Sequence, residues 1–225
     1  MLIAARNAFL MSGAKLPYDA EVEYLESTGT QYVDTGITGN PSTTRLDISV
    51  TTPSSITSAA FLCGARGVDS AHNVTGLILV YLSGASSLWR LDTTGSFYGA
   101  GRPLSITCDT GTDYTFSMQG TACLVNGVTY SSTAVKENAD SGLNVYIGTS
   151  NNNGTAAAGM PVKIRFAALW QNDTLVRDYI PVRVGSDPSA VGYLYDRANP
   201  DGGPLGNGLY PNAGTGAFVI GPDKP

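Results

Sequence analysis

Three glutamates lie close together near the start of the chain, and paired carboxylates are the groups that glycoside hydrolysis uses. Glu21, Glu23 and Glu26 stand in the stretch EVEYLE. A retaining hydrolase needs two carboxyl groups about 5–5.5 Å apart, one as nucleophile and one as acid/base. In a regular strand Glu21 and Glu23 share a face while Glu26 points the opposite way, so a catalytic pair requires a β-bulge. We therefore expect alternation to place Val22 and Tyr24 inward and Glu21 and Glu23 in solvent, and we assign no catalytic residue.

No other familiar catalytic or metal-binding pattern is present. His72 is the only histidine, and it stands in a Gly- and Asn-rich stretch, so a Ser-His-Asp triad is not expected. Neither a glycine-rich phosphate loop nor a Cys/His zinc spacing occurs, and there is no D-x-[DN]-x-[DN]-G calcium loop. The sequence therefore predicts no enzyme activity, no cofactor and no metal site.

The pairing of the cysteines and the role of one group of charged residues each have two interpretations. Three cysteines, Cys63, Cys108 and Cys123, cannot all pair within one chain, so we expect reduced, partly buried side chains. An alternative places Cys108 and Cys123 face to face across a hairpin. A second set comprises Arg177, Asp178, Arg183, Asp196 and Arg197. These charges form either ion pairs within the fold or the polar floor of a binding site, and ion pairing is favoured because paired charges are common at strand ends.

Sugar binding is the remaining chemistry that the side chains suit. Lectins combine an exposed aromatic ring with amide and carboxylate hydrogen-bonding groups on loops. The candidate glycan-binding residues are Trp89, Tyr98, Asn152, Tyr195 and Tyr210. Packing within the sheets is the competing role for each aromatic residue, since β-sandwiches use such rings as filler. Trp170 is assigned to the core.

The composition indicates the elements that must position these residues. The chain has 225 residues with 27 glycines and 12 prolines, and short apolar runs alternate with Thr, Ser and Asn, which is typical of strands joined by turns. Charged residues make up 14% and the net charge is −5, so neither nucleic acid nor a membrane is an expected partner. Strands are expected at 22–24, 31–34, 45–50, 59–64, 76–82, 87–92, 104–108, 113–118, 122–125, 128–131, 143–149, 162–171, 174–181, 191–195 and 218–221.

Two hairpins and one long loop stand out among these elements. Asn126-Gly127 suits a type I′ turn between two strands, because both residues tolerate positive φ. The polar segment 171–173 separates two further strands, and alternation in the first of them places Ile164, Phe166, Ala168 and Trp170 on one face, which we expect to be core. Residues 198–216 are rich in glycine and are expected to form surface loops.

The first residues differ in composition from the remainder. Leu2, Ile3, Phe9 and Leu10 surround Arg6 and Asn7 and fit a short amphipathic helix, too short to span a bilayer. Such a helix is marginal alone, so it requires a surface to pack on, either its own domain or a partner. We divide the chain into an N-terminal anchor segment, helical or extended, at residues 1–17 and one domain at residues 18–225.

Recurring phrases along residues 18–223 resemble a known family. They are YLESTGTQYVDTG, FLCGAR, LVNGVTY, LWQNDTLVRDYIPVR, GYLYDRAN and LYPNAGTGAFVIGPD. They are similar to a laminin-G-like, concanavalin A-like jelly-roll family of bacteriophages and gut bacteria. The resemblance implies an all-β sandwich of two antiparallel sheets whose first and last strands lie close together. EVEYLE also resembles the E-x-D-x-x-E motif of laminarinase-like glucanases, with Glu23 in place of Asp.

The resemblance leads to the following functional expectation. The chain is expected to be a non-enzymatic virion surface protein of a bacteriophage, of the head-fibre or decoration type. Its N-terminal segment would attach to a capsid or other virion protein, its copies would form a homo-oligomer, and its jelly roll would bind host or mucosal glycans. The alternative is a bacterial cell-surface or secreted carbohydrate-binding protein, followed by a glucanase-type glycoside hydrolase.

Overall fold

The computed structural model describes residues 15–40, 43–55, 60–68, 73–82, 88–92, 95–96, 105–107, 109–119, 122–131 and 141–225. At residues 68, 73–82, 88–92, 95–96, 105–107 and 131 the description is limited to the backbone. Within these ranges the chain consists of strands and connecting turns, with no helix, as its composition predicts. In this part of the chain there is accordingly no helix with the length and hydropathy needed to cross a lipid bilayer.

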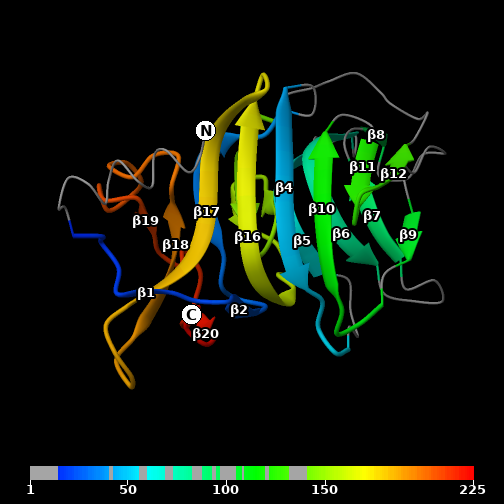
Figure 1. Ribbon diagram of the computed structural model, residues 1–225. Helices are drawn as coiled ribbons and strands as arrows, with labels where there is room; N and C mark the ends of the chain where they lie inside the picture. Colours follow the sequence, from blue (N-terminus) through cyan, green and yellow to red (C-terminus); the bar gives the residue numbers. More distant parts are fainter. Residues whose placement is uncertain are drawn as a thin grey trace.

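The strands form two sheets that pack face to face (Figure 1). We call them the large and the small sheet. In spatial order the large sheet contains β12 (Val128–Ser131), β11 (Ala122–Val125), β10 (Asp113–Gln119), β4 (Thr44–Thr51), β16 (Pro161–Gln171), β17 (Thr174–Val184), β18 (Val191–Asp196) and β19 (Leu209–Tyr210). Short strands flank this order: β1 (Ala20–Glu21) pairs with β17, and β2 (Leu25–Thr28) pairs with β16 and with β20 (Val219–Ile220).

The small sheet lies behind the large one in Figure 1. Its spatial order is β15 (Thr155–Ala156), β14 (Asn151–Asn152), β5 (Ala60–Val68), β6 (Asn73–Leu82), β7 (Leu88–Asp92) and β9 (Ser105–Thr107). β13 (Asn144–Ile147) pairs with β5 and with β3 (Val33–Thr38), and β8 (Gly95–Ser96) pairs with β6. Among the described strands, pairing is antiparallel apart from the short parallel pairing of β14 with β5; an isolated parallel bridge also joins Phe61 of β5 to Gly159.

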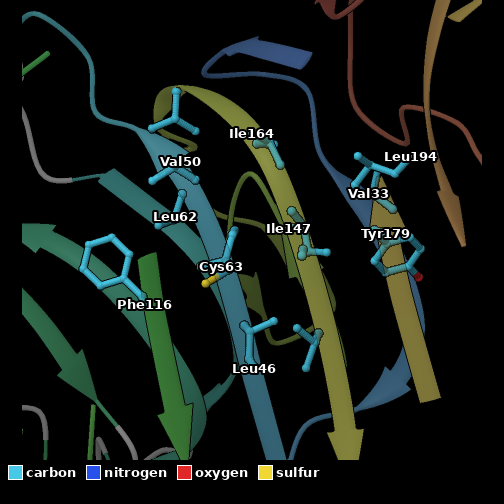
Figure 2. Packing of buried hydrophobic residues seen from close by; sticks show 14 of the residues in the cluster. Val33, Leu46, Val50, Leu62, Cys63, Phe116, Ile147, Ile164, Tyr179 and Leu194 are labelled. Atoms are coloured by element: carbon cyan, nitrogen blue, oxygen red, sulfur yellow. The ribbon is translucent and has the colours of Figure 1, made fainter. Parts of the chain in front are cut away.

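The hydrophobic core lies between the two sheets. In β4, buried residues alternate with partly exposed ones, so that Leu46, Ile48 and Val50 point inward. Figure 2 shows side chains of both sheets in this core, among them Phe116 of β10 and Leu62 of β5. Each large apolar side chain buried in this way contributes about 1.5–3 kcal/mol relative to full exposure. The period-2 pattern of β4 therefore specifies which of its faces belongs to the core.

The sandwich is closed by the two ends of the domain. Leu25 of β2 lies opposite Ile220 of β20, and Val22 forms an isolated bridge with Asp223. The expected all-β jelly-roll sandwich is confirmed, and so is the proximity of its first and last strands. The N-terminal segment 1–14, including the predicted anchor residues Leu2, Ile3, Phe9 and Leu10, lies outside the described residues.

Both predicted hairpins are confirmed, with two-residue turns. Asn126 and Gly127 have φ values of 49° and 81° between β11 and β12. Asn172 and Asp173 have φ values of 48° and 60° between β16 and β17. Positive φ at both central residues is what a type I′ turn requires, and Asn, Asp and Gly tolerate it best.

The predicted core face of residues 164–170 is wrong beyond its first residue. The register of β16 against β4 shifts between Ile164 and Phe166, so Arg165 is an extra residue in the ladder. Such a β-bulge reverses the alternation that follows it. Ala167 and Leu169 therefore face the core, while Phe166 and Trp170 lie on the opposite, outer face of the large sheet.

The alternation expected for EVEYLE is also interrupted. β1 ends at Glu21 and β2 begins at Leu25, with a bend between them. Val22 is buried as expected, but the next core residue is Leu25, and Tyr24 is only partly buried. The bend allows β1 to pair with β17 while β2 pairs with β16, which a single continuous strand could not do.

The cysteines that the structure describes are buried more deeply than predicted. Cys63 and Cys123 form no disulfide, and both are fully rather than partly buried in the core between the sheets. Cys108 lies outside the described residues, so its predicted approach to Cys123 stays a prediction. The long 198–216 segment consists mostly of turns, as expected, although Leu209 and Tyr210 within it are buried.

Candidate functional site

Two of the five predicted glycan-binding residues lie inside the protein. Tyr195 is 5% exposed and packs with Ile180, Val182 and Leu209 on the outer side of β17 and β18. Tyr18 covers it, with the two ring centroids 5.0 Å apart. Tyr210 is 2% exposed and faces the core. Because neither ring presents a face to solvent, the expected surface platform at these two tyrosines is corrected to a packing role.

The other three predicted residues do not join them. Asn152 belongs to β14 in the small sheet, opposite Arg66 of β5, whereas Tyr195 and Tyr210 belong to the large sheet. Trp89 is placed by its backbone in β7 of the small sheet, between Tyr81 of β6 and Ile106 of β9. Tyr98 lies outside the described residues. The structure therefore does not assemble the predicted five into one site.

The strongest candidate site lies instead on the outer face of the large sheet, on its central strands. Asp47 of β4 accepts a hydrogen bond from the Ser117 hydroxyl at 2.6 Å and another from the Trp170 indole N–H at 3.0 Å. The Arg45 guanidinium lies 3.3 Å from the same carboxylate and 4.1 Å from the centre of the Trp170 ring. We call these four residues, Arg45, Asp47, Ser117 and Trp170, the Trp170 cluster.

The Trp170 cluster is fixed in place and open to solvent. The side chains of Arg45 and Asp47 are 29% and 21% exposed, and Trp170 is partly exposed. Asp47 is held by Ser117 from β10 and Trp170 from β16, so the three central strands position one carboxylate. A carboxylate has about four acceptor positions, so Asp47 retains capacity for another donor such as a sugar hydroxyl.

A second cluster lies on the same face, at the other end of β16. Arg165 lies between the Thr51 hydroxyl, 3.1 Å from its Nε, and the Asp113 carboxylate, 3.5 Å away. The Tyr24 ring has the Lys163 ammonium 4.5 Å and the Arg165 guanidinium 5.7 Å from its centre. We call Tyr24, Lys163 and Arg165 the Tyr24 cluster. Seven residues of strand, about 20 Å, separate Lys163 from Trp170.

Part of this face could have been found in the sequence. The strict alternation of TRLDISVT already places Arg45 and Asp47 opposite the core-facing Leu46. Trp170 was missed because unbroken alternation from Ile164 assigns it to the core, and no local signal marks the bulge at Arg165. Ser117 and Tyr24 join the face only through the pairing of distant strands.

The group of charges Arg177, Asp178, Arg183, Asp196 and Arg197 forms ion pairs, as the favoured interpretation predicted. Arg197 makes two hydrogen bonds to Asp178, at 2.8 and 3.0 Å. Arg183 hydrogen-bonds both oxygens of Asp223 at 2.7 Å. These partners come from strands or termini that the fold brings together, so the charges serve the structure.

The third ion pair is buried. Arg177 lies 3.6 Å from Asp196, whose side chain is fully buried, and donates a hydrogen bond to the Thr35 carbonyl. Asp196 also accepts the backbone N–H groups of Asp178 and Ala198. Burial raises the pKa of Asp196 above its ordinary value, and the Asp178 hydrogen bond and the Arg177 charge oppose this shift without cancelling it. Asp196 is thus an element of stability rather than an exposed ligand.

This raised pKa gives a pH-dependent stability of defined sign. The folded protein holds the Asp196 proton more tightly than the unfolded chain, whose carboxyl titrates near pH 3.9. Relative to an Asp196→Asn variant, the free energy of unfolding of the parent is expected to fall as pH rises from about 4 and to level off above the folded-state pKa. Urea unfolding at a series of pH values measures this difference.

Asp223→Asn provides the control of opposite sign in the same series. The Arg183 hydrogen bond holds the pKa of Asp223 below its ordinary value. The parent therefore has a higher free energy of unfolding than this variant above about pH 3.9, and the difference is lost as pH falls through the folded-state pKa. A difference between the parent and Asp196→Asn that did not change with pH would contradict the assignment.

The glutamates of EVEYLE occupy separate positions. Glu21 of β1 is near Lys224, 4.0 Å away, and the Tyr18 hydroxyl, 3.4 Å away. Glu26 of β2 lies opposite Lys163 in the ladder with β16. The two carboxylates thus belong to ladders with different strands, which supports the structural interpretation of this stretch. No cluster of metal-ligating side chains occurs among the residues that the structure describes.

The fold defines the chain as an all-β protein of the jelly-roll sandwich class. We compared it with known proteins. No family model matches the chain, and no curated protein matches it either. Among solved structures it is similar to a Bacteroides ovatus ATCC 8483 protein to which carbohydrate binding is provisionally assigned, with a TM-score of 0.51 and 12% identity. The match covers 91% of this chain and 61% of that protein, so the chain spans less than two thirds of its length.

Proposed function

We propose that this chain is a non-enzymatic carbohydrate-binding domain whose binding site is the Trp170 cluster. The carrying observation is the Asp47 carboxylate held by Trp170, Ser117 and Arg45 on the open face of the central strands. The Arg45 guanidinium lies over the Trp170 ring, so the indole surface that it leaves uncovered would meet the C–H face of a sugar, while the carboxylate and the guanidinium take its hydroxyls. The similarity to the Bacteroides protein is consistent with this chemistry.

The spacing of carboxylates on this face supports binding rather than cleavage. Asp47 and Asp113 are the acidic residues of the central strands β4 and β10. Asp47 lies opposite Ser117, four residues along β10 from Asp113, which corresponds to about 13 Å. Inverting hydrolysis requires about 6.5–9.5 Å and retaining hydrolysis about 5–5.5 Å, so this pair suits neither.

The Trp170→Ala variant tests the proposed site. We expect its dissociation constant for a bound glycan to rise roughly 30-fold, the equivalent of about 2 kcal/mol for loss of a central aromatic contact. A glycan array identifies the ligand, and isothermal titration calorimetry measures the affinity. Trp170→Phe retains a ring but loses the N–H bond to Asp47, so it should bind with intermediate affinity.

Tyr130→Ala is the matched control for this test. Tyr130 is a 37% exposed residue on β12, and three strands, β11, β10 and β4, separate it from β16. Its loss should leave glycan affinity within about twofold of the parent. A parent protein that binds no glycan on the array, or a Trp170→Ala variant that binds like the parent, would overturn the proposal.

For the biological setting, we propose the bacterial cell surface or the secreted fraction. The solved structure with a similar fold, from a Bacteroides species, supports this alternative. Display on a virion through residues 1–17, with a capsid or other virion protein as partner and copies of the chain as a homo-oligomer, rests on the sequence resemblance. Copurification of the protein with phage particles, rather than with the bacterial surface, would favour that setting.

A further inference from the structure

The Tyr24 cluster suggests which glycans this face prefers. It places an ammonium and a guanidinium over one aromatic ring, 4.5 and 5.7 Å from its centre. A cation over a tyrosine ring is attracted to the ring face, so Tyr24 holds both positive groups at a defined spacing. Lys163 and Arg165 are two residues apart in β16, on the outer face, and β2 brings Tyr24 beside them.

Much of the hydrogen-bonding capacity of these cations is unused. Among the described residues, Lys163 forms no ion pair, even though Glu26 lies opposite it in the ladder. Arg165 bonds Thr51 and approaches Asp113 through Nε, while its two terminal nitrogens donate no hydrogen bond to a described residue. The ammonium and the outer edge of the guanidinium therefore remain available to an incoming acceptor.

The geometry points to an anionic substituent, a carboxylate or a sulfate, on the glycan that the Trp170 cluster binds. A guanidinium matches the two oxygens of such a group, and an adjacent ammonium adds a point charge. The site is local, because the protein as a whole carries a net charge of −5 and attracts polyanions weakly. The separation of about 20 Å between Lys163 and Trp170 requires an oligosaccharide rather than a single sugar.

The charged residues around the Tyr24 cluster determine how strongly it should prefer an anionic glycan. Glu26 and Asp113 offset the two cations in number, but the Asp113 side chain is 65% exposed and Glu26 makes no ion pair with Lys163. Solvent therefore screens both carboxylates. We expect the anionic form of a glycan to bind about tenfold more tightly than its neutral counterpart, about 1.4 kcal/mol. The preference should decrease as ionic strength increases.

The test uses glycans matched in pairs that differ only by a carboxylate or sulfate, such as polygalacturonate and its fully methyl-esterified form. The inference rests on the proposed function, and the two can fail separately. Stronger binding of the anionic members supports the inference. Equal binding within every pair overturns it and leaves carbohydrate binding intact. Absence of binding to every glycan overturns the proposed function itself.

Variants locate the preference on the Tyr24 cluster. In Lys163→Gln combined with Arg165→Gln, the tenfold preference within a pair should disappear. Glu26→Gln should increase the preference, because it removes a negative charge opposite Lys163. Lys224→Gln, which removes an exposed cation near Glu21, should not alter it. A double variant that keeps the preference of the parent would show that the anion binds elsewhere and would overturn the inference.

Discussion

Replacement of Asp196 by alanine is expected to lower the free energy of unfolding by about 3–5 kcal/mol at neutral pH. Asp196 has no exposed side-chain surface, and its loss leaves the mostly buried Arg177 guanidinium without its counter-ion. It also removes the acceptor of the Asp178 and Ala198 backbone N–H groups. Breaking a buried pair costs more than the pair contributes, because the remaining charge stays desolvated. Urea unfolding of the parent and the variant measures this loss.

The Arg183 and Asp223 pair provides a matched control for this experiment. Their hydrogen bonds are shorter, at 2.7 Å, but the Asp223 side chain is 48% exposed and solvent screens the pair. Removal of Asp223 by alanine should therefore lower the free energy of unfolding much less than removal of Asp196 does. If Asp196→Ala were no more destabilising than Asp223→Ala, burial would not be the source of the effect, and the role assigned to Asp196 would be wrong.

The second large effect is expected for Gly214→Ala, which should lower the free energy of unfolding by roughly 3 kcal/mol. A Cβ atom at this position would overlap the carbonyl oxygen of Thr30 and lie 3.0 Å from the Tyr32 ring. The neighbouring backbone cannot move aside easily, because Ala213 and Thr215 donate hydrogen bonds to the Tyr32 and Thr30 carbonyls. These bonds fasten the loop before β20 to the segment before β3, so the substitution should loosen the closure of the sandwich.

Gly206→Ala separates this steric effect from the effect of backbone conformation. Gly206 has a φ of 69°, and a Cβ atom there meets only open space. Its replacement by alanine should lower the free energy of unfolding by about 1–2 kcal/mol, the ordinary strain of a non-glycine residue in the left-handed conformation. Thermal or urea unfolding compares the two variants. Equal losses would mean that Gly214 has no special packing role.

The outer face of the large sheet shows why the candidate site was only partly predictable. Arg45 and Asp47 follow from the alternation of β4, since a period of two assigns faces within one strand. Trp170 does not, because the extra residue at Arg165 reverses the alternation between it and Ile164. Tyr195 was a candidate for sugar binding, but Tyr18 and the strands around it cover its ring, so the competing packing role applies. Exposure of an aromatic residue depends on neighbours that are distant in sequence.

The sequence by itself determined the all-β class, most of the longer strands, and the two hairpins at Asn126-Gly127 and at residues 171–173. These features depend on residues within one strand or turn, where alternation and positive φ act over a few positions. The tertiary structure alone decided that Asp47 receives bonds from Ser117 and Trp170, because these residues lie 70 and 123 positions away. Cross-strand register and bulges arise from pairing between strands. The local pattern therefore predicts that β4 has an outer face, and the pairing of strands decides which residues of other strands share that face.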